Sequence, residues 1–162
     1  MFLPLFLLLK TKKPKAIFIE PIVGALRLGI LPLVFGDVII DEVRGCCIFS
    51  GETTLDNLSF SLYERGFKIE KVIQAGITDG VYDLKGKIIS KITPKNFGEI
   101  KKALRGAEGI DVTGGMIHKV EESLKMARRG IKTWIINGLK RDNLYKAIVA
   151  KPTWGTLIAG TC

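Results

Sequence analysis

The chain has 162 residues, a length that suits one domain with a hydrophobic core of its own. Hydrophobic residues make up 47% of it and charged residues 25%, which is the balance of a soluble globular protein. The formal net charge of +9 predicts a surface that attracts phosphate groups, whether they belong to nucleotides, nucleic acids or lipids.

The distribution of the basic residues argues against a nucleic acid partner. Only Lys10, Lys12, Lys13 and Lys15 form a dense cluster, and no aromatic-rich RNA motif lies beside it. The apolar start, Met1 to Leu9, is too short to cross a bilayer as a helix. Its lysines also follow the apolar run, whereas those of a signal peptide precede it. We therefore expect no membrane partner and a cytoplasmic protein.

The cysteines and the histidine predict no metal centre. Cys46 and Cys47 are adjacent and Cys162 is remote, so neither a zinc site with CxxC spacing nor a disulfide framework is expected. The sole histidine, His118, has no evident metal partner in the sequence. Reduced thiols in a cytosolic chain are the simplest interpretation.

The first third of the chain predicts strands, a helix and a hairpin. Leu5 to Leu9 predicts a buried strand, which a basic loop follows. Glu20 to Leu28 predicts a helix, because a proline in the first turn and a glycine after the end are typical helix boundaries. Ile30 to Phe35 is a continuous apolar run, as in a strand covered on both faces. Val38 to Glu42 and Cys46 to Phe49 flank a short turn and predict a hairpin.

The rest of the chain alternates between helices and strands. Thr53 to Arg65 predicts a helix with leucines along one stripe, and Ile69 to Ala75 predicts a strand. Gly115 to Arg129 is the clearest helix, with apolar residues on one face and Gly130 at its end. The remaining predicted elements are helices at residues 93–104 and 141–150, strands at residues 132–136 and 155–158, and a small hairpin turn at residues 85–87. This alternation predicts an α/β fold with a mainly parallel sheet and helices on both sides.

Glycine-marked junctions between these elements are the candidate ligand loops. They are residues 36–38, 50–52, 78–82 and 111–116, and three of them follow or flank predicted strands. Ligands of open α/β sheets bind outside the carboxyl ends of the strands. Loops at these ends present backbone N–H groups and helix N-termini to phosphate.

The segment Thr113-Gly114-Gly115 is the most informative junction, because it opens the clearest helix. Two glycines let the backbone approach an anion without a Cβ in the way. Lys119 follows in the first turns, where its charge opposes the helix dipole, and a bound anion would neutralise that charge. A solvated surface lysine after an ordinary capping loop explains the same spacing equally well.

The other junctions have simpler explanations from spacing alone. Ser50 is expected to cap the helix that follows it, although Glu52 is also placed to lie beside a lysine or Mg²⁺. Asp79-Gly80 has the composition of a plain turn. The sequence contains no Walker A loop, no GxGxxG motif and no credible catalytic triad, and His118 is expected to be a partly exposed helix residue.

Taken in this order, the segments resemble the amino acid kinase superfamily, and within it the archaeal isopentenyl phosphate kinases. The resemblance rests on Pro32–Val38, Ser50–Glu52, Asp79–Tyr82, Asp111–Met116 with Lys119, Asn137-Gly138 and Gly155-Thr156. It implies a three-layer αβα sandwich with a mainly parallel central sheet, in one truncated domain. Residues 1–35 would remain from the acceptor-side half, and residues 36–162 would form the nucleotide-binding half.

The resemblance also implies a reaction. Such kinases transfer the γ-phosphate of ATP, with Mg²⁺, to the phosphate of isopentenyl phosphate and so form isopentenyl diphosphate. Lys119 would contact the transferring phosphate, and Glu52 would organise catalytic lysines. The nucleotide would be bound by Thr78, Asp79, Gly80, Tyr82, Gly114, Gly115, Asn137 and Gly138, and the acceptor by Gly36, Asp37 and Gly51.

The sequence departs from the family's pattern at several points. Glu52 stands where the family has aspartate, and residues 76–80 lack the first aspartate of the nucleoside loop. The family's lysine strand with a Gly-Gly-Ser loop, and its later histidine segment, do not occur. We therefore expect an incomplete kinase that a separate N-terminal chain completes. By itself the chain is expected to be a homo-oligomer or poorly soluble, because a shortened sheet exposes edges and an apolar face. The alternatives are a non-catalytic nucleotide-binding or regulatory module, and another superfamily member such as a uridylate kinase.

Overall fold

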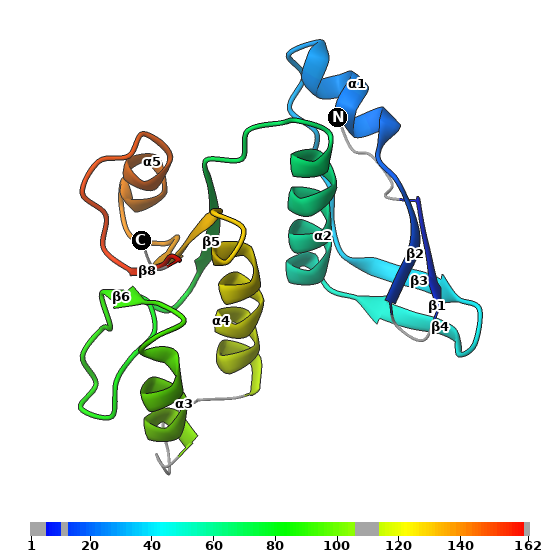
Figure 1. Ribbon diagram of the computed structural model, residues 1–162. Coiled ribbons are helices and arrows are strands. Elements are labelled where there is room, and N and C mark those ends of the chain that lie inside the picture. Colours follow the sequence, from blue (N-terminus) through cyan, green and yellow to red (C-terminus); the bar gives the residue numbers. More distant parts are fainter. Residues whose placement is uncertain (1–5, 11–12, 106–113, 161–162) are drawn as a thin grey trace. The chain divides into compact units, whose positions relative to one another are not determined.

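The computed structural model describes residues 6–10, 13–105 and 114–160. It divides into two compact units, Met1–Ile69 (unit 1) and Glu70–Cys162 (unit 2) (Figure 1). Asp111, Val112 and Thr113, which the sequence singled out, lie outside the described residues. In the part of the chain that is described, no helix has both the length and the apolar character needed to cross a membrane.

Unit 1 contains a four-stranded sheet of order β2-β1-β3-β4 and two helices. Strand β1 pairs antiparallel with β2 and parallel with β3, and β3 pairs antiparallel with β4. The bounds are β1 Phe6–Lys10, β2 Lys13–Phe18, α1 Glu20–Arg27, β3 Asp37–Asp41, β4 Gly45–Phe49 and α2 Gly51–Glu64. The predicted first strand is confirmed as β1, although Leu5 and the side chains of β1 lie outside the described residues.

The predicted basic loop after the first strand is wrong, because Lys13 and Lys15 lie in strand β2. Strand β2 is an edge of the sheet, where lysine and proline are tolerated because one side of the strand needs no backbone partner. The register between β1 and β2 shifts at Leu8/Leu9, and Leu9 is paired with Pro14. A composition that suggests a loop therefore also suits a protected edge strand.

The predicted strand at Ile30 to Phe35 is also wrong, since this segment forms no strand and is not covered on both faces. Leu31 is 83% exposed and Phe35 54% exposed. Gly29 ends the preceding helix with a φ of +70°, and Pro32 supplies no N–H for a sheet. Continuous apolar character alone therefore does not identify a buried strand here.

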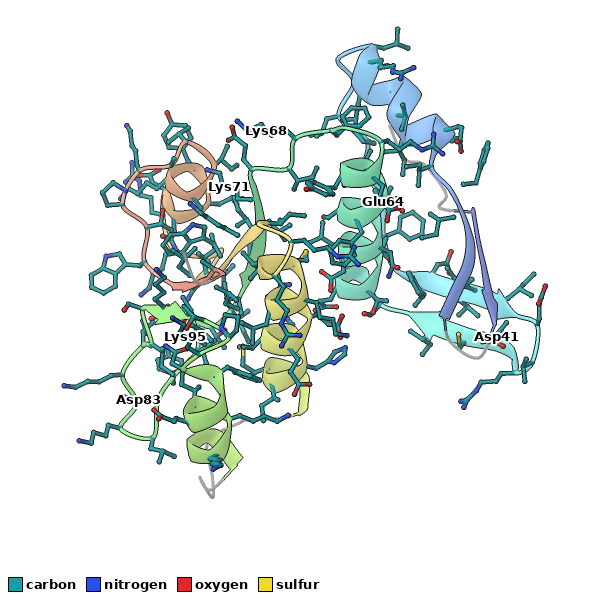
Figure 2. All side chains as sticks on the ribbon, in the orientation of Figure 1. Asp41, Glu64, Lys68, Lys71, Asp83 and Lys95 are labelled. Atoms are coloured by element: carbon teal, nitrogen blue, oxygen red, sulfur yellow. The ribbon has the colours of Figure 1, made fainter. Side chains whose placement is uncertain are left out.

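The predicted hairpin is confirmed by β3 and β4. Asp41, labelled in Figure 2, is buried, and its Oδ1 accepts hydrogen bonds from the backbone nitrogens of Val43 at 2.9 Å and Arg44 at 3.0 Å. Gly45 completes the turn with a φ of +81°. This Asx-type turn fixes the hairpin register, so that Asp37 lies opposite Phe49 at the open end.

Unit 2 contains a second four-stranded sheet, of order β5-β7-β8-β6. Strands β5 and β7 are parallel, as are β6 and β8, while β7 and β8 are antiparallel. The bounds are β5 Lys71–Gly76, β6 Lys91–Ile92, α3 Phe97–Arg105, α4 Gly114–Ala127, β7 Lys132–Asn137, α5 Asn143–Ile148 and β8 Thr156–Ile158. The α/β class is confirmed, with mixed pairing in the sheets, and β6 is the one short strand of unit 2 that the sequence pattern did not predict.

Helices α4 and α5 lie on opposite sides of the unit 2 sheet (Figure 1). Helix α4 packs on β7 and β8, and α5 packs on β7 and β5. The core between α4 and the sheet is made of Val81, Ile92, Val120, Leu124, Ala127, Ile135 and Ile158. On the other side, the Lys71 ammonium, labelled in Figure 2, donates to the carbonyls of Ala147 and Ile148 at 2.8 Å each and so satisfies the end of α5. These contacts fix α4 and α5 on the two faces of the unit 2 sheet.

Candidate functional site

The carboxyl ends of β5 and β7 form the candidate site in unit 2. The two strands are parallel and in register, with Gly76 opposite Asn137, so the loops after them leave the same edge of the sheet. The Gly138 backbone nitrogen donates to the Gly76 carbonyl at 2.8 Å and extends the pairing past the strand end. A Cβ on Gly138 would lie 3.1 Å from the Ala75 Cβ, so a larger residue would crowd this junction.

Three side chains join these two loops. The Asn137 amide nitrogen donates to Asp79 Oδ1 at 2.8 Å and to the Ile77 carbonyl at 3.0 Å. The Lys140 ammonium lies 2.8 Å from Asp79 Oδ2. The Asn137 amide oxygen accepts from the Leu139 backbone nitrogen at 2.9 Å. The structure therefore brings together the predicted residues Asp79 and Asn137, and it adds Lys140, which sequence reasoning missed.

The electrostatics of this group favour the ionised carboxylate. The hydrogen bond from Lys140, and after it the one from Asn137, holds the pKa of Asp79 below its ordinary value of 3.8. Asp79 is thus a fixed anion with a cation beside it. The sequence suggested a plain turn at Asp79-Gly80. In the structure, Asp79 also joins this loop to Asn137 and Lys140.

Gly80 and Tyr82 continue the same loop into the core. Gly80 has a φ of +151°, and a Cβ there would lie 2.7 Å from Thr156 Oγ1. The Thr156 hydroxyl also accepts from the Val81 backbone nitrogen at 2.8 Å. Tyr82 pairs with Ile88 in a small antiparallel bridge. Thr78, Asp79, Gly80 and Tyr82 therefore belong to one loop whose far end is held by β8.

The predicted hairpin turn at residues 85–87 follows directly and is confirmed. Asp83, labelled in Figure 2, accepts from the backbone nitrogens of Lys85 at 2.8 Å and Lys87 at 2.9 Å. Gly86 adopts a φ of +72° between them. The Asp83 carboxylate therefore accepts two backbone N–H groups of the turn, and after the turn the chain runs toward β6.

Asn143 supports the candidate site through hydrogen bonds to the end of β7. Sequence reasoning also missed this residue. Its amide nitrogen donates to the carbonyls of Asn137 at 3.0 Å and Trp154 at 3.1 Å. Its amide oxygen accepts from the Trp154 backbone nitrogen at 3.3 Å. Asn143 is buried at the start of the short helix α5. Its hydrogen bonds join two separate segments, the end of β7 and the backbone at Trp154. Its partners lie in different parts of the sequence, so the sequence itself carries no signal for them.

Helix α4 begins at the predicted di-glycine segment, with Gly114 as its first residue and Gly115 exposed. Its first turn contains no acidic residue, and a negative charge at this end of a helix is favoured by the helix dipole. Lys119 is partly buried one turn further along. His118 is 58% exposed, with Nδ1 4.0 Å from a Glu122 oxygen, in agreement with the prediction of a partly exposed helix residue.

The remaining predicted residues lie in unit 1, around the start of α2. Ser50 is the N-cap, and its hydroxyl accepts from the Thr53 backbone nitrogen at 3.2 Å, which confirms the predicted cap. A Cβ on Gly36 would lie 2.6 Å from the Gly51 backbone nitrogen, so the junctions at residues 36–38 and 50–52 touch. Asp37 is exposed, and its Oδ1 accepts from its neighbour's backbone nitrogen at 2.7 Å. Glu52 lies in the first turn of α2 and is partly buried.

The described residues contain no group of three or more histidine, cysteine or acidic side chains that could hold a metal ion. Cys46 and Cys47 are free thiols, and Cys162 lies outside the described residues.

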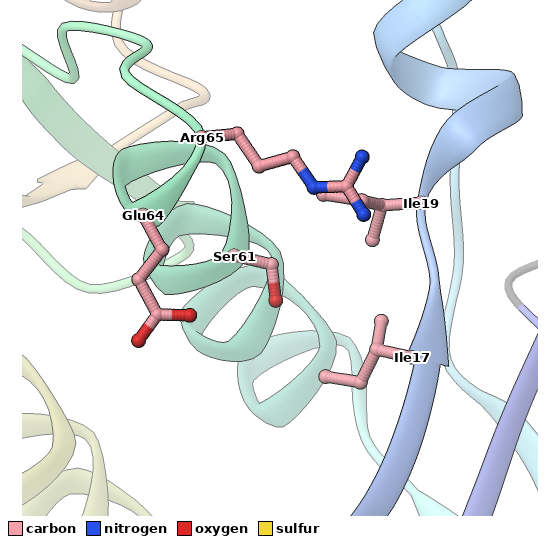
Figure 3. Close-up of a pocket in the computed structure, with 5 residues that line it drawn as sticks. All are labelled: Ile17, Ile19, Ser61, Glu64 and Arg65. Atoms are coloured by element: carbon pink, nitrogen blue, oxygen red, sulfur yellow. The ribbon is translucent and has the colours of Figure 1, made fainter.

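Unit 1 also contains a cavity of about 370 Å³, shown in Figure 3. Its lining residues are Ile17, Ile19, Ser61, Glu64 and Arg65. The Arg65 guanidinium at its rim forms an ion pair with Glu20, and this hydrogen bond is the main reason that the pKa of Glu20 is lowered. None of the residues predicted for the site lines this cavity. The guanidinium of Arg65 is already paired with Glu20.

Known proteins resemble this chain in sequence and in fold. The sequence model of the amino acid kinase family matches residues 4–137. The isopentenyl phosphate kinase of Methanocaldococcus jannaschii is 33% identical over 126 residues, which cover 78% of this chain and 45% of that protein. The acetylglutamate kinase of Campylobacter curvus is 28% identical over 138 residues, which cover 85% of this chain and 45% of that protein.

A solved structure gives the same result for the fold. An isopentenyl phosphate kinase structure superposes with a TM-score of 0.74 at 23% identity, over 97% of this chain and 58% of that chain. The chain spans about half the length of the curated relatives it matches.

Proposed function

Because the chain belongs to the amino acid kinase family, we propose that its unit 2 binds ATP and that the chain forms the nucleotide-binding part of a kinase. The kinase would transfer the γ-phosphate of ATP to the phosphate of isopentenyl phosphate, in the cytoplasm. The observation that carries the proposal is the joined pair of loops after β5 and β7, held by Asp79, Asn137 and Lys140. This is the edge of an open α/β sheet at which ligands bind.

The residues of unit 2 suit a nucleotide. The start of α4 supplies backbone N–H groups, glycines without Cβ atoms and no acidic side chain in the first turn, which together favour an anion. Lys119 lies one turn away and would neutralise phosphate oxygens. Mg²⁺ would enter bound to the phosphates, because the described residues offer no acidic cluster of their own.

The acceptor is proposed from the relatives. Isopentenyl phosphate kinases and acetylglutamate kinases both match the chain. Of three relatives that match over more than three quarters of it, the two isopentenyl phosphate kinases are 33% and 30% identical and the acetylglutamate kinase 28%. In unit 1, Gly36, Asp37 and Gly51 would lie near the acceptor, and Glu52 would organise catalytic lysines. The tight contact between Gly36 and Gly51 supports this grouping, since it places the two junctions together.

A separate N-terminal chain that contains the family's lysine strand and Gly-Gly-Ser loop would complete the enzyme. A second candidate function is a nucleotide-binding or regulatory module without turnover. It is favoured by Glu52, which adds a methylene where the resemblance implies aspartate, because a misplacement of about 1 Å can cost ~100-fold in rate.

The proposal is tested by incubating the purified chain with ATP, Mg²⁺ and isopentenyl phosphate, uridylate or N-acetylglutamate in parallel. The same assays are repeated after adding a separately produced N-terminal half of the Methanocaldococcus jannaschii kinase. We expect isopentenyl diphosphate in the complemented reaction and no product with the other acceptors. Phosphorylation of N-acetylglutamate or uridylate instead would reject the proposed acceptor. Binding of ATP without transfer in every mixture would favour the module.

A further inference from the structure

We infer that Lys140 is a positioning residue of the candidate nucleotide site, which acts through Asp79 to hold the loop at residues 77–82 against the turn after β7. The inference rests on the proposed function for the nature of the ligand. No sequence motif points to Lys140. The polar atoms around Lys140 are joined in one network of hydrogen bonds between the two loops.

The Asn137 side chain is fully committed within the protein. Both hydrogens of its amide are donated, one to Asp79 Oδ1 and one to the Ile77 carbonyl, and its oxygen accepts from the Leu139 backbone nitrogen. The donors and the acceptor match the partners in one orientation of the amide only. Asn137 therefore joins two loops and has no donor left for a ligand.

The Asp79 carboxylate has a protein donor on each of its two oxygens. Oδ1 accepts from Asn137 and Oδ2 from Lys140, at 2.8 Å each. Each oxygen thus has a protein donor, one of them charged, and charge-assisted hydrogen bonds are the stronger kind. These bonds fix the orientation of the carboxylate, so Asp79 holds the backbone of residues 78–80 beside that of residues 138–140.

Lys140 lies on the exposed side of the hydrogen-bond network formed by Asn137 and Asp79. Its side chain is 48% exposed and that of Asp79 is 26% exposed. An ion pair of this exposure contributes little to global stability. It does restrain where the 77–82 loop lies relative to the end of β7, since 61 sequence positions separate its two members. The expected effect of removing it is local.

The test uses Lys140→Met, Asp79→Asn and the double variant, with Lys125→Met as the matched control. Lys125 is also an exposed lysine of unit 2 with a carboxylate partner, Glu122, but it lies at the far end of α4. Amide hydrogen exchange of residues 77–82 in the free chain is measured first. The dissociation constant of a fluorescent ATP analogue with Mg²⁺ is measured next.

We expect each single variant to speed exchange of residues 77–82 by about two- to fivefold, and the double variant no further, because both changes break one interaction. Nucleotide affinity should fall by a similar factor, and Lys125→Met should change neither quantity. Unchanged exchange in Lys140→Met would overturn the inference. So would a loss of affinity on adding Lys140→Met to Asp79→Asn, because Lys140 would then contact the ligand itself. A wild-type chain that binds no nucleotide defeats the proposed function, while the exchange data still decide whether Lys140 positions the loop.

Discussion

The Thr156 hydroxyl accepts a hydrogen bond from the Val81 backbone nitrogen at 2.8 Å, and both residues are buried. The bond joins β8 to the end of the candidate nucleotide loop. A buried N–H without a partner is costly, so we expect Thr156→Val to lower the free energy of unfolding by about 1–3 kcal/mol. Thr156→Ser, which keeps the hydroxyl, should lose clearly less. Urea unfolding measures both variants, and a loss in Thr156→Val no larger than that in Thr156→Ser would contradict the importance of the hydrogen bond, because valine keeps the methyl group and lacks only the hydroxyl.

Gly155, next to Thr156, is expected to tolerate no side chain. It has a φ of +156°, and a Cβ there would lie 2.4 Å from the Ile135 carbonyl oxygen in β7. Because that oxygen belongs to the sheet, Gly155→Ala should cost at least ~2 kcal/mol. Gly24→Ala is the control, since Gly24 lies within α1 with open space around its Cβ position. It should be neutral or stabilise by up to about 1 kcal/mol. Thermal unfolding that ranks the two variants the other way would contradict the local geometry.

Ser50 offers a test in unit 1. Its hydroxyl caps α2 by accepting from Thr53, so Ser50→Ala should lower stability by ~1 kcal/mol. Ser50→Asp keeps an acceptor at the N-cap and adds a charge that favours the helix dipole, and it should retain wild-type stability. Circular dichroism during urea unfolding measures both variants. A loss in Ser50→Asp as large as in Ser50→Ala would mean that the serine has a role other than capping.

The charge of Asp79 predicts a dependence on pH. Its pKa is lowered in the folded chain, so the ionised form contributes stability above the ordinary value of 3.8, and this contribution is lost as the pH falls through that value and below. Wild type should therefore be slightly more stable than Asp79→Asn at pH 7, by the small amount expected of an exposed ion pair, and the difference should shrink below about pH 4. Denaturant unfolding at both pH values measures it. A difference that stays constant to pH 3 would exclude the Lys140 pairing as its cause.

Much of the fold was predictable, because it depends on local patterns. The apolar runs of β5 and β7 and the amphipathic helix α4 follow from composition and periodicity. The ordered motifs also predicted the amino acid kinase family, which the family match confirms. Two local predictions failed for physical reasons. The lysines of β2 are those of an edge strand, and the apolar run at residues 30–35 contains a proline and is exposed.

The candidate site was predicted only in part. Asp79 and Asn137 belong to recognisable motifs, but their contact depends on the register of β5 and β7, which a single sequence does not specify. Lys140 and Asn143 carry no motif of their own. Their partners lie 61 positions away for Lys140 and in two separate segments for Asn143, so only the folded chain identifies them.

The central claim is that the start of α4 holds the phosphates of ATP, with Lys119 beside them. The most direct measurement is the dissociation constant of ATP with Mg²⁺, by calorimetry, for wild type, Lys119→Ala and Lys125→Ala. We expect wild type to bind, Lys119→Ala to bind at least about tenfold more weakly through the loss of a charge-assisted contact, and Lys125→Ala to match wild type. Equal affinity in wild type and Lys119→Ala, or no binding by wild type at millimolar ATP, would contradict the claim.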